Sequence, residues 1–454
     1  MSPTTPTPPM IGSASAGDPY LPTSGNGGYT VDHYDLDLDY RVSTNRLTAT
    51  ATITGRAITA LSRFSLDLAG LSVDKVTVAG RAPTRVMHTA RKLLVTPAEP
   101  LVAGESFEVV VRYRGAPHPV RSHWGEVGWE ELTDGVLVAG QPNGAPSWFP
   151  CNDHPSDKAT FRIQVTCEAP YTVVSNGPVV AKNTRSGRTT WSFEVREPMA
   201  AYLASVQIGR YRRHDLTAAP VAHSLFFPPA LARQVAVDFA RLGDMISVFS
   251  DAFGPYPFPA YSVVVTADDL EIPLEAHGLG VFGKNHVDGA HGSDRLIAHE
   301  LAHQWFGNSL TLTRWADIWL HEGFACYAEW IWAEAAGGPT AHQNALLHRV
   351  DLDKEPKNLA VGDPGPRAMF DDRVYKRGAL ALHAVRQALG DETFFTALRA
   401  YTRTHRHGSV TTDDLLGCFR AASGSRAADK IIARWIDAKS LPQLQAAPPL
   451  PATP

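Results

Sequence analysis

The chain has 454 residues, which is long enough for two or three domains with a large hydrophobic core. Its formal net charge of -4 supplies neither a polycation for nucleic acid nor a basic face for a membrane surface, so we expect neither as a partner. No run of about 18 apolar residues occurs, so no membrane span is predicted. The four cysteines, Cys151, Cys167, Cys326 and Cys418, are too scattered for a disulfide framework. The pair Cys151 and Cys167 could still form a disulfide bond.

The first 28 residues are rich in Ser, Thr, Pro and Gly and lack the basic start and apolar core of a secretory signal. We predict that residues 1–28 form a flexible tail that partly lies on the first domain. The proline-rich residues 446–454 are predicted to be disordered. Because no export signal is recognised, we expect a cytoplasmic location, with secretion as the alternative.

From residue 29 the hydrophobic pattern has a period of two. Tyr34, Leu36 and Leu38 alternate with aspartates, as in a strand that buries one face. Similar segments separated by turn residues follow at 47–53, 64–68, 75–78, 107–113, 161–167, 171–175, 191–195 and 203–211. Residues 29–214 are therefore predicted to form an all-β sandwich or saddle domain.

Near residue 215 the pattern changes to helices mixed with a small sheet. Residues 233–253 have helical spacing of apolar residues, and residues 261–266 have the composition of a buried strand. Further helices are predicted over residues 294–306, 320–335, 340–351, 371–389, 392–405, 412–422 and 427–436. The sequence thus predicts an α+β multidomain fold whose second domain, residues 215–445, is mainly helical.

Two histidines, His299 and His303, stand one helical turn apart in the helix predicted over residues 294–306. They share one helix face and can bind a single metal ion, while the carboxylate of Glu300 projects beside them, where it can take a proton from the attacking water. A hydrolytic zinc site needs a third protein ligand and an open position. Glu322, in the first turn of the next predicted helix, is the candidate.

Two other interpretations of this motif remain open from the residues alone. The histidines could be ordinary members of an amphipathic helix. They could also belong to a structural zinc site, although such sites usually employ four protein ligands rich in cysteine. No such set accompanies them in the sequence.

Residues 297–308 (IAHELAHQWFGN) and 319–325 (WLHEGFA) resemble the zinc signature of the gluzincin metallopeptidases of the aminopeptidase N family, which is related to leukotriene hydrolase. Residues 148–155 (WFPCNDHP) resemble that family's F-P-C-x-D-E-P segment, and residues 374–379 (VYKRGA) resemble its Y-x-K-G-A segment. The resemblance implies a β-rich N-terminal domain, a thermolysin-like catalytic domain with a small sheet, one zinc ion per chain, and a general-base role for Glu300.

The resemblance also implies roles for residues outside the metal motif. Tyr375 matches the family's catalytic tyrosine, which would donate a hydrogen bond to the oxyanion. Glu275 matches the glutamate of the family's G-x-M-E-N segment, which binds the substrate's ammonium group, but the flanking Ile272 and Ala276 depart from that segment. Gln141 falls roughly where the family has a second amine-binding polar residue, and its uncharged amide binds an ammonium less strongly than a carboxylate would.

Other acidic residues offer weaker hypotheses. Asp317 is a candidate for orienting a ligand histidine through a hydrogen bond. Asp268, Asp269 and Glu271 either form a solvated loop or line a cleft that attracts amine-bearing or basic peptides.

The leading hypothesis is a zinc aminopeptidase that removes N-terminal residues from peptides. The alternatives are an endopeptidase or small-molecule hydrolase that uses the same zinc site, and a binding protein with a silent site. Many relatives carry a further helical domain that closes over the site, and this chain stops shortly after residue 442. We therefore expect no C-terminal helical domain and a more open cleft.

Overall fold

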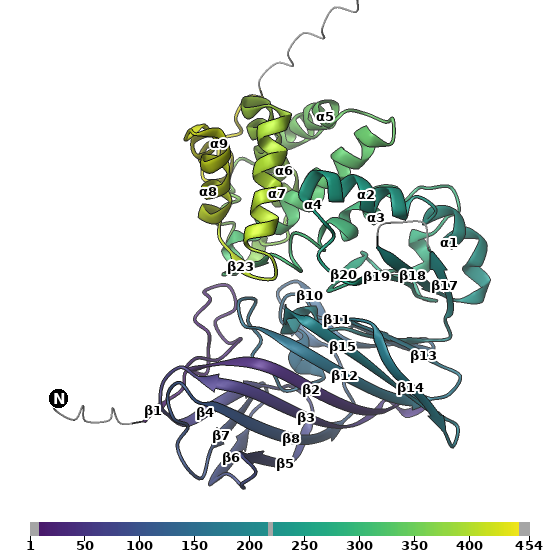
Figure 1. Ribbon diagram of the computed structural model, residues 1–454, viewed down its shortest axis with the longest axis vertical. Coiled ribbons are helices and arrows are strands. Elements are labelled where there is room, and N and C mark those ends of the chain that lie inside the picture. Colours follow the sequence, from purple (N-terminus) through teal and green to yellow (C-terminus); the bar gives the residue numbers. More distant parts are fainter. Residues whose placement is uncertain (1–8, 217–220, 445–454) are drawn as a thin grey trace, which may run out of the picture. The chain divides into compact units, whose positions relative to one another are not determined.

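The computed structural model describes residues 9–216 and 221–444 (Figure 1). The chain forms two compact units that alternate along the sequence. Within the described residues, the sheet unit comprises residues 9–216, 221–237 and 258–290, and the helical unit comprises residues 238–257 and 291–444. The predicted α+β multidomain fold is thus confirmed. The boundaries at 29–214 and 215–445 remain predictions, and the tail predicted at 446–454 lies outside the described residues.

The main element of the sheet unit is a seven-stranded sheet in the order β14-β15-β12-β2-β3-β8-β5. Its strand β2 (Tyr29–Arg41) pairs antiparallel with β3 (Arg46–Ala57) and parallel with β12 (Lys158–Glu168). From Tyr34 to Tyr40 the apolar residues of β2 are buried at every second position, as the period of two predicts. The other strands of this sheet are β5 (Ser72–Val78), β8 (Ser106–Gly115), β14 (Val179–Arg185) and β15 (Arg188–Ala200).

Three smaller sheets complete the sheet unit. The first, in the order β1-β4-β7-β6, consists of β1 (Met10–Ile11), β4 (Leu61–Asp67), β6 (Arg85–His88) and β7 (Lys92–Thr96). The second, in the order β13-β16-β11-β10-β9, consists of β9 (Val120–Ser122), β10 (Gly125–Leu132), β11 (Gly135–Ala139), β13 (Thr172–Ser175) and β16 (Val206–Gly209). The third, in the order β17-β18-β19-β21-β20, consists of β17 (Arg212–Leu216), β18 (Ala222–Phe227), β19 (Ala260–Val265), β20 (Leu274–Ala276) and β21 (Leu279–Phe282), and β20 is an edge strand.

Residues 9–28 are an ordered part of the sheet unit. Strand β1 pairs in parallel with β4. The buried Asn26 donates its side-chain amide to Asp67 Oδ2 over 2.8 Å and its backbone N–H to Asn152 Oδ1 over 2.6 Å. The flexible tail predicted for residues 1–28 is therefore not found from residue 9 on, because strand pairing and buried hydrogen bonds hold this segment in place.

The helical unit is built around α4 (Trp319–Ala335), which is buried over nearly its whole length and packs against α3 (Asp294–Ala302) and α6 (Asp372–Leu389). The other helices are α2 (Leu242–Phe253), α5 (Ala341–Lys354), α7 (Asp391–Thr404), α8 (Thr412–Ser423) and α9 (Ala427–Ile436). In α1 (Ala232–Asp238) the sequence passes from the sheet unit, which includes Val237, to the helical unit, which begins again at Asp238. Two predicted helices differ from the structure. The helix expected over 233–253 is divided into α1 and α2, and α3 ends four residues earlier than predicted.

Two glycines allow α4 and α6 to approach closely. A Cβ atom added to Gly323 of α4 would lie 2.8 Å from Gly378 Cα, and one added to Gly378 of α6 would lie 2.8 Å from Gly323 Cα. Real Cβ atoms do not come so near to backbone atoms, so only glycine at both positions permits this crossing. The crossing matters because the two helices carry Glu322 and Tyr375.

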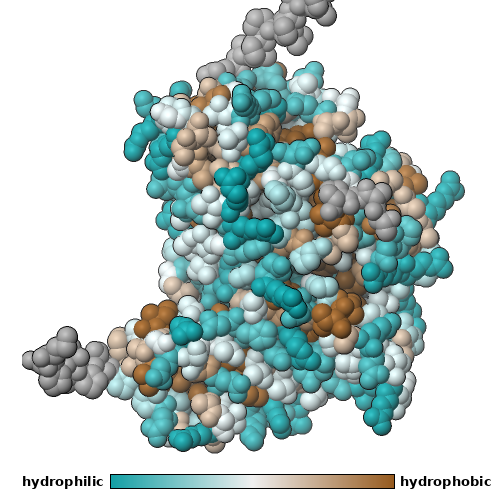
Figure 2. Space-filling model, in the orientation of Figure 1, coloured by the Kyte–Doolittle hydropathy of each residue, from teal (hydrophilic) through white to brown (hydrophobic). Residues whose placement is uncertain are grey.

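The surface drawn in Figure 2 is mainly hydrophilic, with scattered hydrophobic patches. Exposed large apolar side chains occur in both units, and three of them, Leu346, Leu347 and Val350, stand on α5. Among residues 9–216 and 221–444, no helix combines the length and hydropathy that crossing a bilayer requires.

We predict opposite stability effects for two glycine substitutions in helices. Gly378→Ala should lower the free energy of unfolding by about 1–3 kcal/mol, because the new Cβ forces α4 and α6 apart. Gly417→Ala in α8 is the matched control, since the nearest atom to its added Cβ is Arg420 Nη2 at 3.9 Å. This control should gain roughly 0.8–1 kcal/mol from helix propensity. Thermal and urea unfolding followed by circular dichroism measure both changes, and equal shifts would refute the close crossing.

Candidate active site

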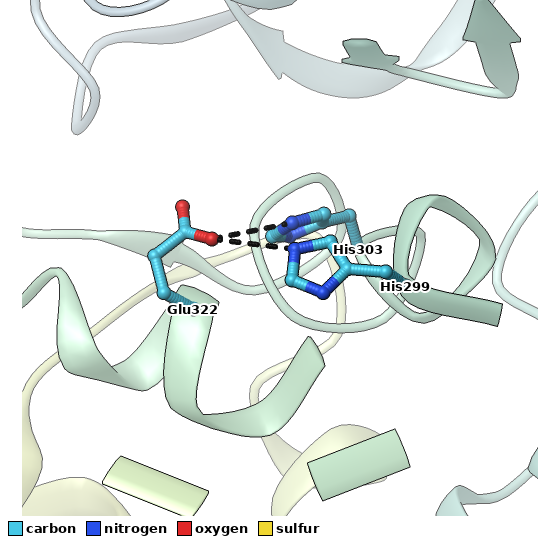
Figure 3. Close-up of side chains that lie close together, drawn as sticks. All are labelled: His299, His303 and Glu322. Atoms are coloured by element: carbon cyan, nitrogen blue, oxygen red, sulfur yellow. Dashed lines mark ion pairs between the residues drawn. The ribbon is translucent and has the colours of Figure 1, made fainter. Parts of the chain in front are cut away.

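Three side chains of the metal-ligand type converge in the helical unit (Figure 3). His299 lies on α3, His303 directly follows the end of α3, and Glu322 lies in the first turn of α4. Glu322 Oε2 is 3.6 Å from His299 Nε2 and 3.5 Å from His303 Nε2. Figure 3 shows both rings and the carboxylate directed at the same space. The structure thus brings together the three residues that the sequence predicted as ligands.

This donor set fits a zinc ion. Two imidazoles and one carboxylate are the protein ligands of a catalytic zinc site, which keeps one position open. Ligand atoms placed tetrahedrally around a zinc ion are about 3.4 Å apart, close to the separations between Glu322 and the two histidines. His303 and Glu322 are each 2% exposed. A carboxylate in so buried a place requires compensating positive charge, which the ion would supply.

Each ligand histidine is oriented by a hydrogen bond from its other ring nitrogen. His299 Nδ1 is 2.7 Å from Glu329 Oε1, and His303 Nδ1 is 3.0 Å from the Phe306 carbonyl oxygen. Because an ionised carboxylate and a carbonyl only accept hydrogen bonds, Nδ1 is the donor in both contacts. Nε2 of each ring then faces Glu322 and can bind a metal ion once it carries no proton.

Glu329 is an ionised carboxylate on the buried helix α4. Arg295 Nη1 donates to both of its oxygens over 3.1 Å. Burial would raise the pKa of Glu329, but His299 and Arg295 outweigh that effect and hold the pKa below its ordinary value. Burial would likewise lower the pKa of His299, yet the nearby carboxylates of Glu322 and Glu329 raise that pKa well above its ordinary value. The site therefore stabilises positive charge.

The role considered for Asp317 is wrong. Its carboxylate accepts hydrogen bonds from Arg314 Nε (2.8 Å) and Thr412 Oγ1 (3.0 Å), and the partner of the ligand histidine is Glu329 instead. Sequence reasoning missed Glu329. The available signal was its position seven residues after Glu322, which puts both carboxylates on one face of a helix.

The two predicted catalytic side chains also lie near the ligands. Glu300 follows His299 on α3 and is 4% exposed. Tyr375 is the fourth residue of α6, in agreement with its predicted place one turn into a helix. Its half-buried ring stacks on that of His299, with centroids 6.0 Å apart and an angle of 20° between the planes. A buried carboxylate and a phenol thus accompany the metal ligands.

The two predicted amine-binding residues contact each other in the sheet unit. Gln141 Nε2 donates a hydrogen bond to Glu275 Oε1 over 2.7 Å, and both side chains are half-buried. Glu275 lies in the edge strand β20. Of the neighbouring acidic residues, Asp268 accepts a hydrogen bond from Thr133, and Asp269 forms an exposed ion pair with Lys284.

Comparison with known proteins extends the resemblance to both parts of the chain. Residues 30–203 match the Peptidase M1 N-terminal domain, and residues 238–435 match the Peptidase family M1 domain. A crystal structure of a mutant M1 zinc metallopeptidase from Deinococcus radiodurans, bound to a Tyr-Ser-Ala substrate, is similar over 95% of this chain and 99% of that chain. The TM-score is 0.87 and the sequence identity is 32%.

Two curated relatives are named aminopeptidases. The chain is 26% identical over 84% of its length to endoplasmic reticulum aminopeptidase 1 of Homo sapiens, and 28% identical over 66% of its length to aminopeptidase N of Lactococcus lactis subsp. lactis. It spans less than half of these relatives, 44% and 38% of their respective lengths. The resemblance predicted from the motifs is therefore confirmed, and the chain belongs to the M1 family of zinc metallopeptidases.

Proposed function

We propose that the protein is a zinc-dependent aminopeptidase that hydrolyses the N-terminal peptide bond of peptides. The observation that carries this proposal is the buried convergence of His299, His303 and Glu322, with Glu300 beside them. The relatives support it, because two are named aminopeptidases and the Deinococcus structure holds a Tyr-Ser-Ala substrate.

In the proposed mechanism, His299, His303 and Glu322 hold the zinc ion, which when bound polarises the scissile carbonyl and acidifies water. Glu300 takes a proton from the attacking water while the water oxygen forms a bond to the carbonyl carbon. When the carbon–nitrogen bond breaks, Glu300 passes this proton to the leaving amine. Tyr375 donates a hydrogen bond from its phenolic O–H to the carbonyl oxygen, which gains negative charge in the transition state.

Glu275 and Gln141 are the proposed amine-binding residues. The carboxylate of Glu275 would pair with the substrate's terminal ammonium, because a cation removed from water needs a counter-charge. The amide of Gln141, which donates to this carboxylate over 2.7 Å, holds it in one orientation. Such a pair selects substrates with a free N-terminus.

We also propose that the protein acts in the cytoplasm, with secretion as the alternative. All four cysteines are free thiols, including Cys151 and Cys167, which the sequence had left open as a pair. Free cysteines are typical of proteins in a reducing compartment. Fractionation of cells expressing the tagged natural protein tests this location, and recovery outside the cytoplasm would contradict it.

The first prediction separates metal binding from chemistry. Wild-type protein should hold one zinc ion per chain, and His303→Ala should lose tight binding because only two protein ligands remain. Glu300→Gln should keep the zinc and lose most turnover, so it serves as the matched control. Metal analysis after dialysis, with peptide hydrolysis on the same samples, measures both. Full zinc occupancy in His303→Ala would disprove the ligand assignment.

A second prediction concerns the oxyanion. Tyr375→Phe should reduce kcat by about 10²–10³-fold, or roughly 2.7–4 kcal/mol, because one transition-state hydrogen bond is removed while the ring is kept. Zinc content should not change. Steady-state kinetics on a free-amine peptide provide the measurement, and near wild-type kcat would mean that another group donates to the oxyanion.

The third prediction tests N-terminal selectivity. N-acetylation of a peptide should cost on the order of 2–5 kcal/mol in kcat/KM, because Glu275 then faces a group that it cannot pair with. Glu275→Ala should largely erase the preference for free-amine peptides, whereas Glu271→Ala, which removes an exposed carboxylate from the same segment, should keep it. If wild-type protein cleaves acetylated peptides internally as readily as it trims free ones, the endopeptidase alternative holds instead.

A further inference from the structure

Helix α6 carries a buried arginine, Arg377, which is 5% exposed. A guanidinium has five N–H donors, and Arg377 makes five hydrogen bonds, each to a different backbone carbonyl. The acceptors are the oxygens of Leu359 (3.4 Å), Trp435, Ala438, Lys439 (3.1 Å) and Ser440 (2.8 Å). Four of the five belong to the end of α9 and the segment directly after it.

Carbonyl dipoles balance this charge. The carbonyls at the end of a helix carry partial negative charge and lack partners within the helix, so a cation there is stabilised. Burial lowers the pKa of Arg377 to about 10, which leaves the side chain charged at neutral pH. Because a buried cation cannot give up its acceptors without a large penalty, the five bonds hold α6 and residues 435–440 in one arrangement.

Arg377 lies on the side of α6 opposite to the catalytic tyrosine. Successive residues of a helix are about 100° apart, so Arg377 is about 200° from Tyr375, while Gly378 is about 60° from it. The structure agrees with this arrangement, since Tyr375 stacks on His299 and Gly378 meets Gly323 of α4. The helix is thus held on one side by α4 and on the other by the carbonyls around Arg377.

We propose that Arg377 is a positioning residue for the reaction: its five carbonyl contacts fix α6 so that the Tyr375 hydroxyl is held where the oxyanion forms. This inference rests on the role proposed for Tyr375. A displacement of about 1 Å at a reacting group can cost 10²-fold in rate, so a loosened α6 lowers kcat although Arg377 touches no substrate.

The identity of the side chain is part of the argument. The family segment Y-x-K-G-A has lysine where this chain has Arg377. A lysine ammonium has three donors around a point charge, and only a guanidinium has a planar fork with five. Arg377→Lys therefore keeps the charge and satisfies some of the carbonyls, so it should restore part of what Arg377→Met loses.

The test compares kcat, KM, zinc content and thermal unfolding in Arg377→Met, Arg377→Lys and Arg349→Met. Arg349 of α5 is the matched control, because its Nε donates to the Pro442 carbonyl over 2.9 Å and its Nη1 pairs with Asp353 of its own helix, so it holds the same C-terminal segment from α5. Arg377→Met should lower kcat on the order of 10- to 100-fold with KM nearly constant and zinc retained. The kcat of Arg377→Lys should lie between those of Arg377→Met and the wild type. Arg349→Met should have a kcat within about twofold of the wild-type value.

A double-mutant cycle with Tyr375→Phe decides whether the effect passes through the tyrosine. In the Tyr375→Phe protein, adding Arg377→Lys should cause no further loss of kcat. If Arg377→Met does not fold, the comparison with Arg377→Lys still tests the proposal. Independent, multiplicative losses, or a change in KM alone, would overturn the positioning role while leaving the proposed function intact. A fully active Tyr375→Phe would instead remove the role of Tyr375, and the proposal for Arg377 would fail with it.

Discussion

A carboxylate buried in the middle of a helix must be paired with positive charge, and the way Glu329 meets this requirement organises the metal site. Its two partners, Arg295 and His299, stand one turn apart on α3. Because both contacts are short and directional, they fix the register of α3 against α4. With that register fixed, Glu322, two turns before Glu329 on α4, faces the Nε2 atoms of both histidines.

Residues whose roles depend on local spacing were predictable from the sequence. The period of two in β2, the pair His299 and His303, and the place of Tyr375 in the first turn of α6 all follow from one short stretch each. The hydrogen-bond partner of His299 could not be predicted from any one short stretch. Whether Asp317 or Glu329 reaches that ring depends on how α3 and α4 cross, and the crossing is set by packing between residues distant in sequence.

The Gln141–Glu275 contact joins positions 134 residues apart. The sequence suggested each residue only through the family resemblance, and it gave no reason for them to touch. The structure supplies a reason, because Leu137, the middle residue of β11, and Ala276, the last residue of β20, belong to one hydrophobic cluster. The ordered segment over residues 9–28 was missed for a related reason. Its composition is typical of a loop, and what anchors it is the distant Asp67 and Asn152.

The alternation of the two units along the chain has a consequence for synthesis on the ribosome. The sheet unit needs residues 258–290, which emerge only after Asp238–Pro257 of the helical unit. Until then β18 lacks its parallel neighbour β19. A nascent chain paused in this interval exposes an unpaired strand edge and apolar residues that later join the core, among them Phe226. Such surface binds chaperones or aggregates, so steady translation through this stretch favours correct folding.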